Sequence, residues 1–194
     1  LAGPLPVAVR LAAWLGTFDA SRFAGASLIN NAAMLTAPAP LVDVDLESLS
    51  QATRIGLEAP LLLTAAFLRA TRTWPCRRRV LHVSSGLGRR GMASSAPYCA
   101  VKAGLDNLAR AQALEEALQA NGAKVCSLAP GVIDTDMQIQ LRGADANAFP
   151  DREAFVQMKS GGKLDSPAAA AAKVVAYLQR ADFGSHPVGD VRDA

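Results

Sequence analysis

Hydrophobic and polar positions follow two different periods along the chain. Long stretches with apolar residues three or four positions apart are typical of amphipathic helices, and short apolar runs are typical of buried strands. The helical spacing covers 7–18, 46–71, 98–120 and 166–180, and the strand-like runs are 26–30, 79–84 and 124–129. Strands that alternate with helices of this length predict parallel βαβ units in a layered α/β fold.

Two segments depart from this regular alternation. Pro60 lies inside the longest helical stretch and predicts a kink there, because proline lacks the N–H that a helix interior needs. The segment 139–162 is polar, so we expect it to be irregular and to cover a substrate. In open parallel sheets ligands bind beyond the carboxyl ends of the strands, which directs attention to the residues that follow each strand.

Composition is typical of one globular domain over 1–194. The chain has 194 residues, of which 51% are hydrophobic and 19% charged, and this balance excludes collagen-like and disordered classes. The longest apolar run, 59–68, is shorter than the roughly 18 residues of a membrane span, so no membrane partner is expected. Cys76, Cys99 and Cys126 have neither disulfide-framework nor zinc-site spacing, so we expect no metal and a reducing, cytoplasmic location.

The net charge of +3 is small, and the basic residues are scattered apart from two clusters. We interpret Arg77, Arg78 and Arg79 as a solvated entrance to a strand. A nucleic-acid interface needs a larger basic stripe, so no nucleic-acid partner is expected. A nucleic-acid binder that uses these arginines stays as a minor alternative, and salt-dependent retention on DNA would support it.

The loop 86–91 reads Gly-Leu-Gly-Arg-Arg-Gly and matches the GxGxxG pattern of dinucleotide-binding turns. That motif needs its last glycine to open a helix whose N-terminus holds the pyrophosphate. The residues after Gly91 are small and polar and lead to Pro97. We therefore do not interpret this loop as a pyrophosphate site.

A stronger chemical signal is the pair Tyr98 and Lys102, with Ser85 thirteen residues upstream at the end of a strand. Residues four apart share one helix face. An ammonium group near a phenol favours the phenolate, so we expect Lys102 to lower the pKa of Tyr98 and make it a better proton donor and acceptor. The alternative is a partly buried tyrosine beside a lysine that only packs against it, which does not account for the position of Ser85.

With these motifs in place, the chain resembles the short-chain dehydrogenase/reductase family from about Ser27 to its end. The matching pieces are Leu28-Ile-Asn-Asn-Ala-Ala33 for LVNNAG, Val83-Ser-Ser85, Tyr98-Cys-Ala-Val-Lys102 for YxASK, and Pro130-Gly-Val-Ile-Asp-Thr135 for PGxxxT. The segments 127–137 and 183–190 are similar to the sepiapterin reductase and benzil reductase branch. The resemblance implies a Rossmann-like, three-layer, doubly wound parallel sheet.

The resemblance also implies roles for individual residues. Tyr98 would give its proton to a carbonyl oxygen that Ser85 holds, and Lys102 would contact the nicotinamide ribose. The residues implied in cofactor binding are Asn31, Ala32, Tyr98, Lys102, Pro130, Gly131, Ile133 and Thr135. Asp190 matches an acidic residue that contacts substrate, although an ordinary surface carboxylate is an equal alternative. Thr135 could instead cap a helix, and His82 is interpreted as a core histidine.

Three departures from the family pattern stand out. The TGxxxGxG turn and its strand have no counterpart in this sequence, and we expect about 60 residues to precede Leu1 in the natural protein, on the family's length. Gly56 stands where the family usually has an asparagine that holds a water in a proton relay to the lysine. Ala33 replaces the glycine of NNAG and would be strained if its φ were positive.

The resemblance therefore implies an oxidoreductase that transfers hydride from NADPH, with NADH less favoured, to a ketone, diketone or pterin-type carbonyl. Apolar positions on the helical stretches 46–71 and 98–120 would pair in a homodimer or homotetramer, although packing within one subunit explains the same pattern. A non-catalytic dinucleotide-fold protein that binds a ligand or partner is the alternative, motivated by Gly56 and the missing glycine turn.

Overall fold

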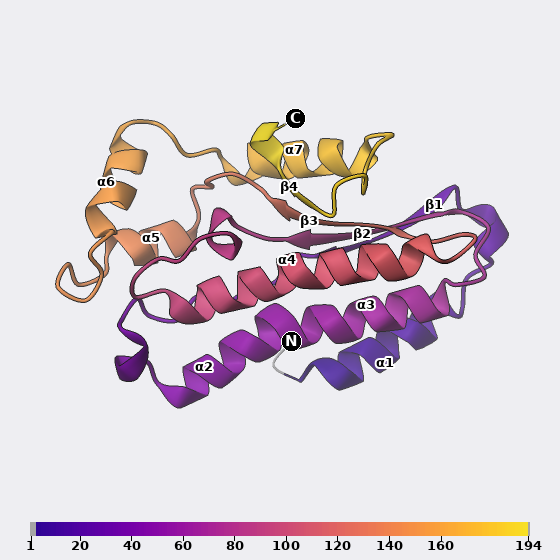
Figure 1. Cartoon of the computed structure of the whole chain (residues 1–194), viewed down its shortest axis with the longest axis horizontal. Coiled ribbons are helices and arrows are strands. Elements are labelled where there is room, and N and C mark those ends of the chain that lie inside the picture. The colour runs from indigo at the N-terminus through magenta and orange to yellow at the C-terminus, as the bar shows by residue number, and fades with distance from the viewer. Residues whose placement is uncertain (1–2, 194) are drawn as a thin grey trace.

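A parallel four-stranded sheet forms the middle layer of the molecule (Figure 1). The computed structural model describes residues 3–193, so residues 1, 2 and 194 of the predicted domain lie outside the described part. The strands run in the order of the sequence, with every neighbouring pair parallel. They are β1 (Gly25–Asn30), β2 (Arg77–Val83), β3 (Lys124–Ala129) and β4 (Val188–Asp190).

Helices cover both faces of the sheet. Figure 1 shows one group of helices on one face, a single helix on the opposite face, and two short helices beyond one end of the strands. The first group is α1 (Pro4–Leu15), α2 (Leu46–Thr53), α3 (Ala59–Ala70) and α4 (Ala96–Ala117), the opposite helix is α7 (Pro167–Gln179), and the short helices are α5 (Asp136–Arg142) and α6 (Arg152–Ser160). The predicted three-layer α/β fold is confirmed.

The central strands are buried on both faces because successive side chains point to opposite sides. Val80 and Val125 pack with Phe67 and other apolar residues of the α1, α3 and α4 layer. Leu81 and Cys126, the next residue along each strand, pack instead in the cluster that includes Leu178 of α7. A strand covered on both faces reads as a continuous apolar run, which is the pattern that predicted it.

The predicted long helix at 46–71 is interrupted, but not by a kink at Pro60. A π-helical segment, η3 (Arg54–Glu58), joins α2 to α3, and the Ala59 N–H bonds to the carbonyl of Arg54 five residues back. Pro60 has no N–H to offer the carbonyl of Gly56, its α-helical partner. The irregularity therefore lies before Pro60, where the missing donor would have bonded.

The prediction of an irregular segment over 139–162 is wrong, because α5 and α6 occupy much of it. Few but well-placed apolar residues hold these helices: Phe149, in the turn between them, is completely buried and packs against Phe155 of α6. The strand β4 was also missed, since three residues are too few for a period to be recognised.

The arginines at the start of β2 are only partly a solvated strand entrance. Arg77 is exposed, but Arg78 is buried, where it lies 3.6 Å from Glu116 and donates to the carbonyl of Asn121. Arg79 donates to the carbonyl of Arg180 at 3.2 Å. The interpretation as a solvated strand entrance is therefore wrong for Arg78, whose guanidinium pairs with groups inside the fold. Within residues 3–193, no helix has the length and apolar character needed to cross a membrane.

Candidate active site

A pocket of about 730 Å³ opens at the carboxyl ends of β1, β2 and β3. Nine of the ten residues that the sequence singled out line it, whereas Asp190 does not. The nine are Asn31, Ala32, Ser85, Tyr98, Lys102, Pro130, Gly131, Ile133 and Thr135. Residues from four separate parts of the chain thus reach one cavity, as the rule for parallel sheets predicts.

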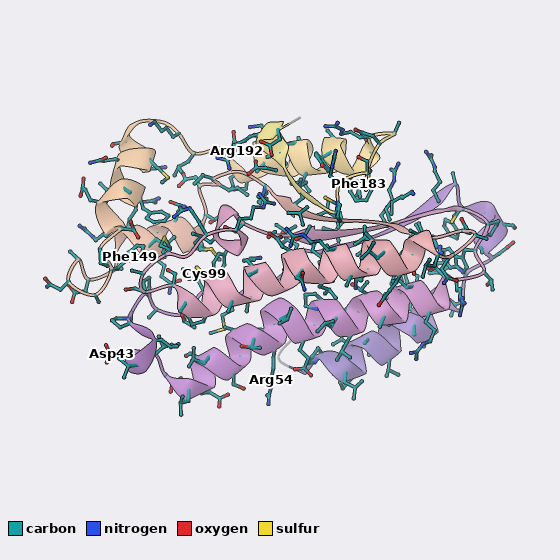
Figure 2. All side chains as sticks on the ribbon, in the orientation of Figure 1. Asp43, Arg54, Cys99, Phe149, Phe183 and Arg192 are labelled. Carbon is teal, nitrogen blue, oxygen red and sulfur yellow. The ribbon has the colours of Figure 1, made fainter. Side chains whose placement is uncertain are left out.

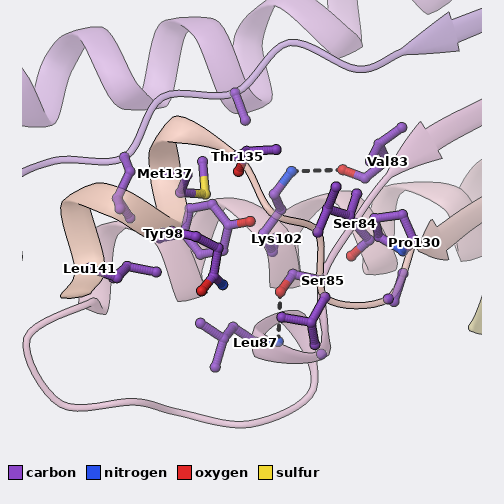
Figure 3. A pocket seen from close by; sticks show the side chains of 18 of the residues that line it. Val83, Ser84, Ser85, Leu87, Tyr98, Lys102, Pro130, Thr135, Met137 and Leu141 are labelled. Carbon is purple, nitrogen blue, oxygen red and sulfur yellow. Dashed lines mark hydrogen bonds between the residues drawn. The ribbon is translucent and has the colours of Figure 1, made fainter. Parts of the chain in front are cut away.

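Ser85 follows β2 and begins the short 3-10 turn η4 (Gly86–Gly88). Its hydroxyl oxygen accepts a hydrogen bond from the Leu87 N–H at 3.2 Å, which Figure 3 shows as a dashed line. A hydroxyl that accepts in this way keeps its own proton to donate. Ser85 can therefore donate to an oxygen placed in the pocket.

Tyr98 lies in the first turn of α4 and points into the pocket beside Ser85 and Lys102 (Figure 3). Burial raises the pKa of its phenol above the ordinary value, and the Ser85 hydroxyl partly offsets this. The net shift is therefore upward, opposite to the lowering expected from Lys102, because burial outweighs the effect of neighbouring groups. The phenol is protonated near neutral pH, which suits a proton donor.

Lys102 lies one turn further along α4 and is almost completely buried. Its Nζ donates to the carbonyl oxygen of Val83 at 2.6 Å and lies 5.4 Å from the centre of the Tyr98 ring (Figure 3). Burial lowers the pKa of Lys102 to about 8, and the charge of Asp106 opposes this shift. An ammonium has three donors, so two remain for groups other than Val83.

Sequence reasoning missed Asp106, which is buried beneath the pocket one turn after Lys102. Its carboxylate accepts from the hydroxyls of Ser84 at 2.6 Å and Ser127 at 2.7 Å, and Arg89 lies 3.5 Å from it. The spacing of four residues after Lys102 is the signal that could have drawn attention to it. Asp106 ties β2, β3 and the loop after Ser85 to the helix that carries Tyr98 and Lys102.

The loop after β3 needs a glycine. Gly131 has a φ of +85°, a left-handed conformation that other residues adopt only with strain. Thr135 occupies the residue before α5, as a helix cap would, but its side chain makes no capping hydrogen bond. Its hydroxyl is therefore available to a ligand. Ala33 does not have a positive φ, so the strain considered for it is absent.

Asp190 is buried at the end of β4 with its carboxylate already paired. Arg192 donates to both oxygens, from Nε at 2.8 Å and from Nη2 at 2.6 Å, and Arg89 lies 3.8 Å away. The hydrogen bonds from Arg192 lower the pKa of Asp190, and the nearby charge of Arg89 acts in the same direction. Arg192, which sequence reasoning missed, lines the pocket in its place.

His82 and the GxGxxG loop are both structural. His82 is completely buried, with its ring nitrogens 3.1 Å from Asn30 Nδ2 and 3.0 Å from Gln112 Oε1. After η4 no helix begins until α4, so the loop cannot hold a pyrophosphate at a helix N-terminus. A Cβ on Gly88 would lie 2.9 Å from Asp106, so this glycine lets the loop pack against α4.

Comparison with known proteins agrees with this geometry. The family model for short chain dehydrogenase matches residues 26–146, and the chain therefore belongs to the short-chain dehydrogenase family. It is 34% identical over 164 residues to benzil reductase ((S)-benzoin forming) of Bacillus cereus, over 84% of this chain and 65% of that enzyme. It is 32% identical over 162 residues to sepiapterin reductase of Mus musculus, over 81% of this chain and 60% of that enzyme.

The resemblance to the sepiapterin reductase and benzil reductase branch is thus confirmed. The chain spans less than two thirds of the length of these two relatives. Among known structures, a protein from Beutenbergia cavernae that holds bound NADP superimposes with a TM-score of 0.74. It is 26% identical in sequence, and the match covers 98% of this chain and 72% of that one.

Proposed function

We propose that this chain carries the catalytic residues of an NADPH-dependent carbonyl reductase that acts on a ketone, a diketone or a pterin-type carbonyl. The observation that carries the proposal is that Ser85, Tyr98 and Lys102 line one pocket at the carboxyl edge of a parallel sheet. The benzil reductase of Bacillus cereus, which is similar over most of this chain, supports a diketone as the first substrate to test.

The residues around the pocket fit a nicotinamide cofactor. Asn31 and Ala32 would hold the ribose on the adenosine side, and Lys102, with two donors left, would hold the nicotinamide ribose. The loop that contains Pro130, Gly131, Ile133 and Thr135 would fix the carboxamide, and the uncapped Thr135 hydroxyl suits that role. When bound, NADPH supplies the hydride, and the bound NADP of the Beutenbergia cavernae protein supports this choice over NADH.

The side chains of the site would handle the proton and the developing charge. Ser85 donates a hydrogen bond to the carbonyl oxygen and orients it. Tyr98, kept protonated by burial, transfers its proton to that oxygen as negative charge builds on it. The ammonium of Lys102 favours the phenolate that this transfer leaves. Each of these interactions is stronger in the transition state than in the ground state, which is the requirement for catalysis.

We expect the protein to act as a cytoplasmic homodimer or homotetramer. The most exposed large apolar side chains include Leu114 of α4, Leu118 directly after the end of α4, and Leu46 at the start of α2. Burying them against a second copy would remove apolar surface from water.

The test is the oxidation of NADPH in the presence of benzil, measured as the decrease in absorbance of the reduced nicotinamide. Tyr98→Phe keeps the ring and removes the proton, so we expect the rate to fall by about 10²–10⁴. The matched control is Tyr177→Phe, because Tyr177 is the other tyrosine of the chain and does not line the pocket. If wild type binds NADPH but oxidises it with none of the ketones tested, the non-catalytic alternative replaces this proposal.

A further inference from the structure

The guanidinium of Arg192 is held in a fixed orientation at the edge of the pocket. It lies in η5 (Val191–Asp193), directly after β4, and its side chain is 65% exposed. Figure 2 labels it on the segment that follows β4. Asp190, which is buried, accepts from Nε, from Nη2 and from the Arg192 backbone N–H at 3.0 Å. A two-point contact of this kind fixes the plane of the guanidinium as well as its position.

This contact uses only one side of the guanidinium. Arginine has five N–H donors, and two of them bond to Asp190. Among residues 3–193 no other acceptor is within hydrogen-bond distance of the Arg192 side chain, so both hydrogens of Nη1 and one of Nη2 stay unused. The free edge of a guanidinium can bind two oxygens or one strongly accepting oxygen.

The wall of the pocket explains why this donor edge matters. Leu87, Met137, Leu141, Phe155 and Met158 make much of that wall apolar. A ligand pocket of this type gains its specificity from a few polar groups at fixed positions. Ser85 and Tyr98 would serve the reacting oxygen, and Arg90 and Arg192 are the two arginines of the lining. Of these two, Arg192 has its guanidinium fixed by a carboxylate, so it offers a donor at a defined position for a different part of the ligand.

We propose that Arg192 binds a second oxygen of the substrate, so that the preferred substrates are ketones that also carry another carbonyl or a carboxylate oxygen. Asp190 is then a positioning residue that holds Arg192 in place, not a substrate contact. This inference rests on the proposed carbonyl reductase function and adds a substrate class to it. Asp190 is suited to this role because Arg89 and the peptide of Arg192 hold its carboxylate as well.

The chain contains a matched control for this arrangement. Arg180 donates from Nε and Nη2 to the carboxylate of Asp182, both at 2.8 Å. This repeats the two-point contact of the Arg192 and Asp190 pair at the same separation of two residues, in reverse order along the chain and with an exposed carboxylate. Neither Arg180 nor Asp182 lines the pocket. Replacing Arg180 therefore removes the same type of ion pair without removing a donor from the site.

The experiment measures kcat/KM of wild type, Arg192→Met, Arg192→Lys and Arg180→Met with three ketones. Benzil has a second carbonyl, phenylglyoxylate has a carboxylate, and deoxybenzoin has the two rings of benzil without the second oxygen. For Arg192→Met we expect kcat/KM to fall about 10- to 100-fold with benzil, phenylglyoxylate or both, because a hydrogen bond from a charged donor is lost. With deoxybenzoin the change stays below about twofold, as it does for Arg180→Met with every ketone.

Two further comparisons separate the outcomes. Arg192→Lys keeps a cation beside Asp190 but loses the fixed fork, so it should show most of the loss if orientation matters. A loss with only one of benzil and phenylglyoxylate identifies which oxygen is bound. Equal losses with deoxybenzoin and benzil, or no loss with either oxygen-bearing ketone, would overturn the inference.

A direct binding measurement keeps this inference separate from the proposed function. Calorimetric titration with phenylglyoxylate should show weaker binding to Arg192→Met than to wild type, and unchanged binding to Arg180→Met. If wild type reduces no ketone but this difference in binding remains, the reductase proposal fails and the assignment of Arg192 stands. If wild type reduces ketones and all three proteins bind phenylglyoxylate and use benzil equally, only the assignment of Arg192 fails.

Discussion

Gly56 of the π-helical segment packs closely against Val101 of α4. The effect of adding a methyl group at Gly56 should therefore depend on the residue at position 101. A Cβ built on Gly56 would lie 2.5 Å from Cγ1 of Val101, far inside normal contact, and 3.6 Å from its Cβ. Val101 is buried and β-branched, so its methyl groups cannot easily turn away. Gly56→Ala therefore forces the two segments apart or Val101 off its rotamer.

The expected size follows from two opposing effects. Adding a methyl group to a packed interior costs about 1–3 kcal/mol, whereas alanine is favoured over glycine in a helix by about 1 kcal/mol. Gly56→Ala should therefore lower the free energy of unfolding by about 1–2 kcal/mol. In a chain of this size 1 kcal/mol changes Tm by about 2–4 °C. In a Val101→Ala background the nearest atom is the Cβ at 3.6 Å, an ordinary contact, and the same substitution should raise Tm.

The four proteins of the double-mutant cycle are wild type, Gly56→Ala, Val101→Ala and the variant with both changes. Thermal and urea unfolding of these proteins measures the effect of Gly56→Ala on stability with and without the valine side chain. Val101→Ala alone provides the control for the cavity that it creates. A Gly56→Ala effect of the same sign and size in both backgrounds would refute the steric explanation. The asparagine that the family usually has at this position needs the space that Val101 occupies, so we also expect Gly56→Asn to be tolerated better when Val101 is alanine.

Three further predictions concern charge and backbone conformation. Burial lowers the pKa of Lys102 from 10.5 to about 8, so the folded state binds fewer protons than the unfolded state between these pH values. The Tm of wild type minus the Tm of Lys102→Met should therefore rise as the pH is raised above 8. A Tm difference that stays flat or falls over this range would contradict the prediction. Gly131→Ala, at a φ of +85°, should cost about 1–2 kcal/mol in urea unfolding, while Gly91→Ala, with open space around its Cβ, should cost little. Asp106→Asn should lower the free energy of unfolding by about 2–4 kcal/mol, because it weakens two hydrogen bonds to a buried carboxylate. Asp136→Asn, at an exposed position, is the control. Similar losses of stability in the two variants would reject this explanation.

Strands and long helices were predictable because their evidence is local. The apolar runs at 26–30, 79–84 and 124–129 each lie within a residue or two of an observed strand. Their order with the helices defined the parallel sheet, and the sheet defined the edge at which the site lies. Helix ends were less accurate: the helix expected from Tyr98 begins at Ala96, because Pro97 starts it and does not end the loop before it.

Elements held by a few distant contacts could not be predicted in this way. The helices α5 and α6 depend on residues such as Phe149, whose burial the local pattern does not reveal. The pairing partners of the site are also remote: Arg89 donates to the carbonyl of Gly189 a hundred residues later, at 2.6 Å. The sequence identified Asp190 as a residue of interest, but only the fold shows that its carboxylate is occupied by Arg192.

We expect the buried carboxylate of Asp106, which does not line the pocket, to help position Ser85, Tyr98 and Lys102. Asp106 accepts from Ser84, the neighbour of Ser85, and from Ser127 on the next strand. Arg89 lies between Asp106 and Asp190, so the same ion network extends to the residue that orients Arg192. A change at Asp106 should therefore disturb Ser85, Lys102 and Arg192 together. Stability and substrate selectivity should then decline in parallel. A change at Arg192 alone should alter selectivity with a smaller loss of Tm, because the buried Asp190 carboxylate keeps Arg89 nearby.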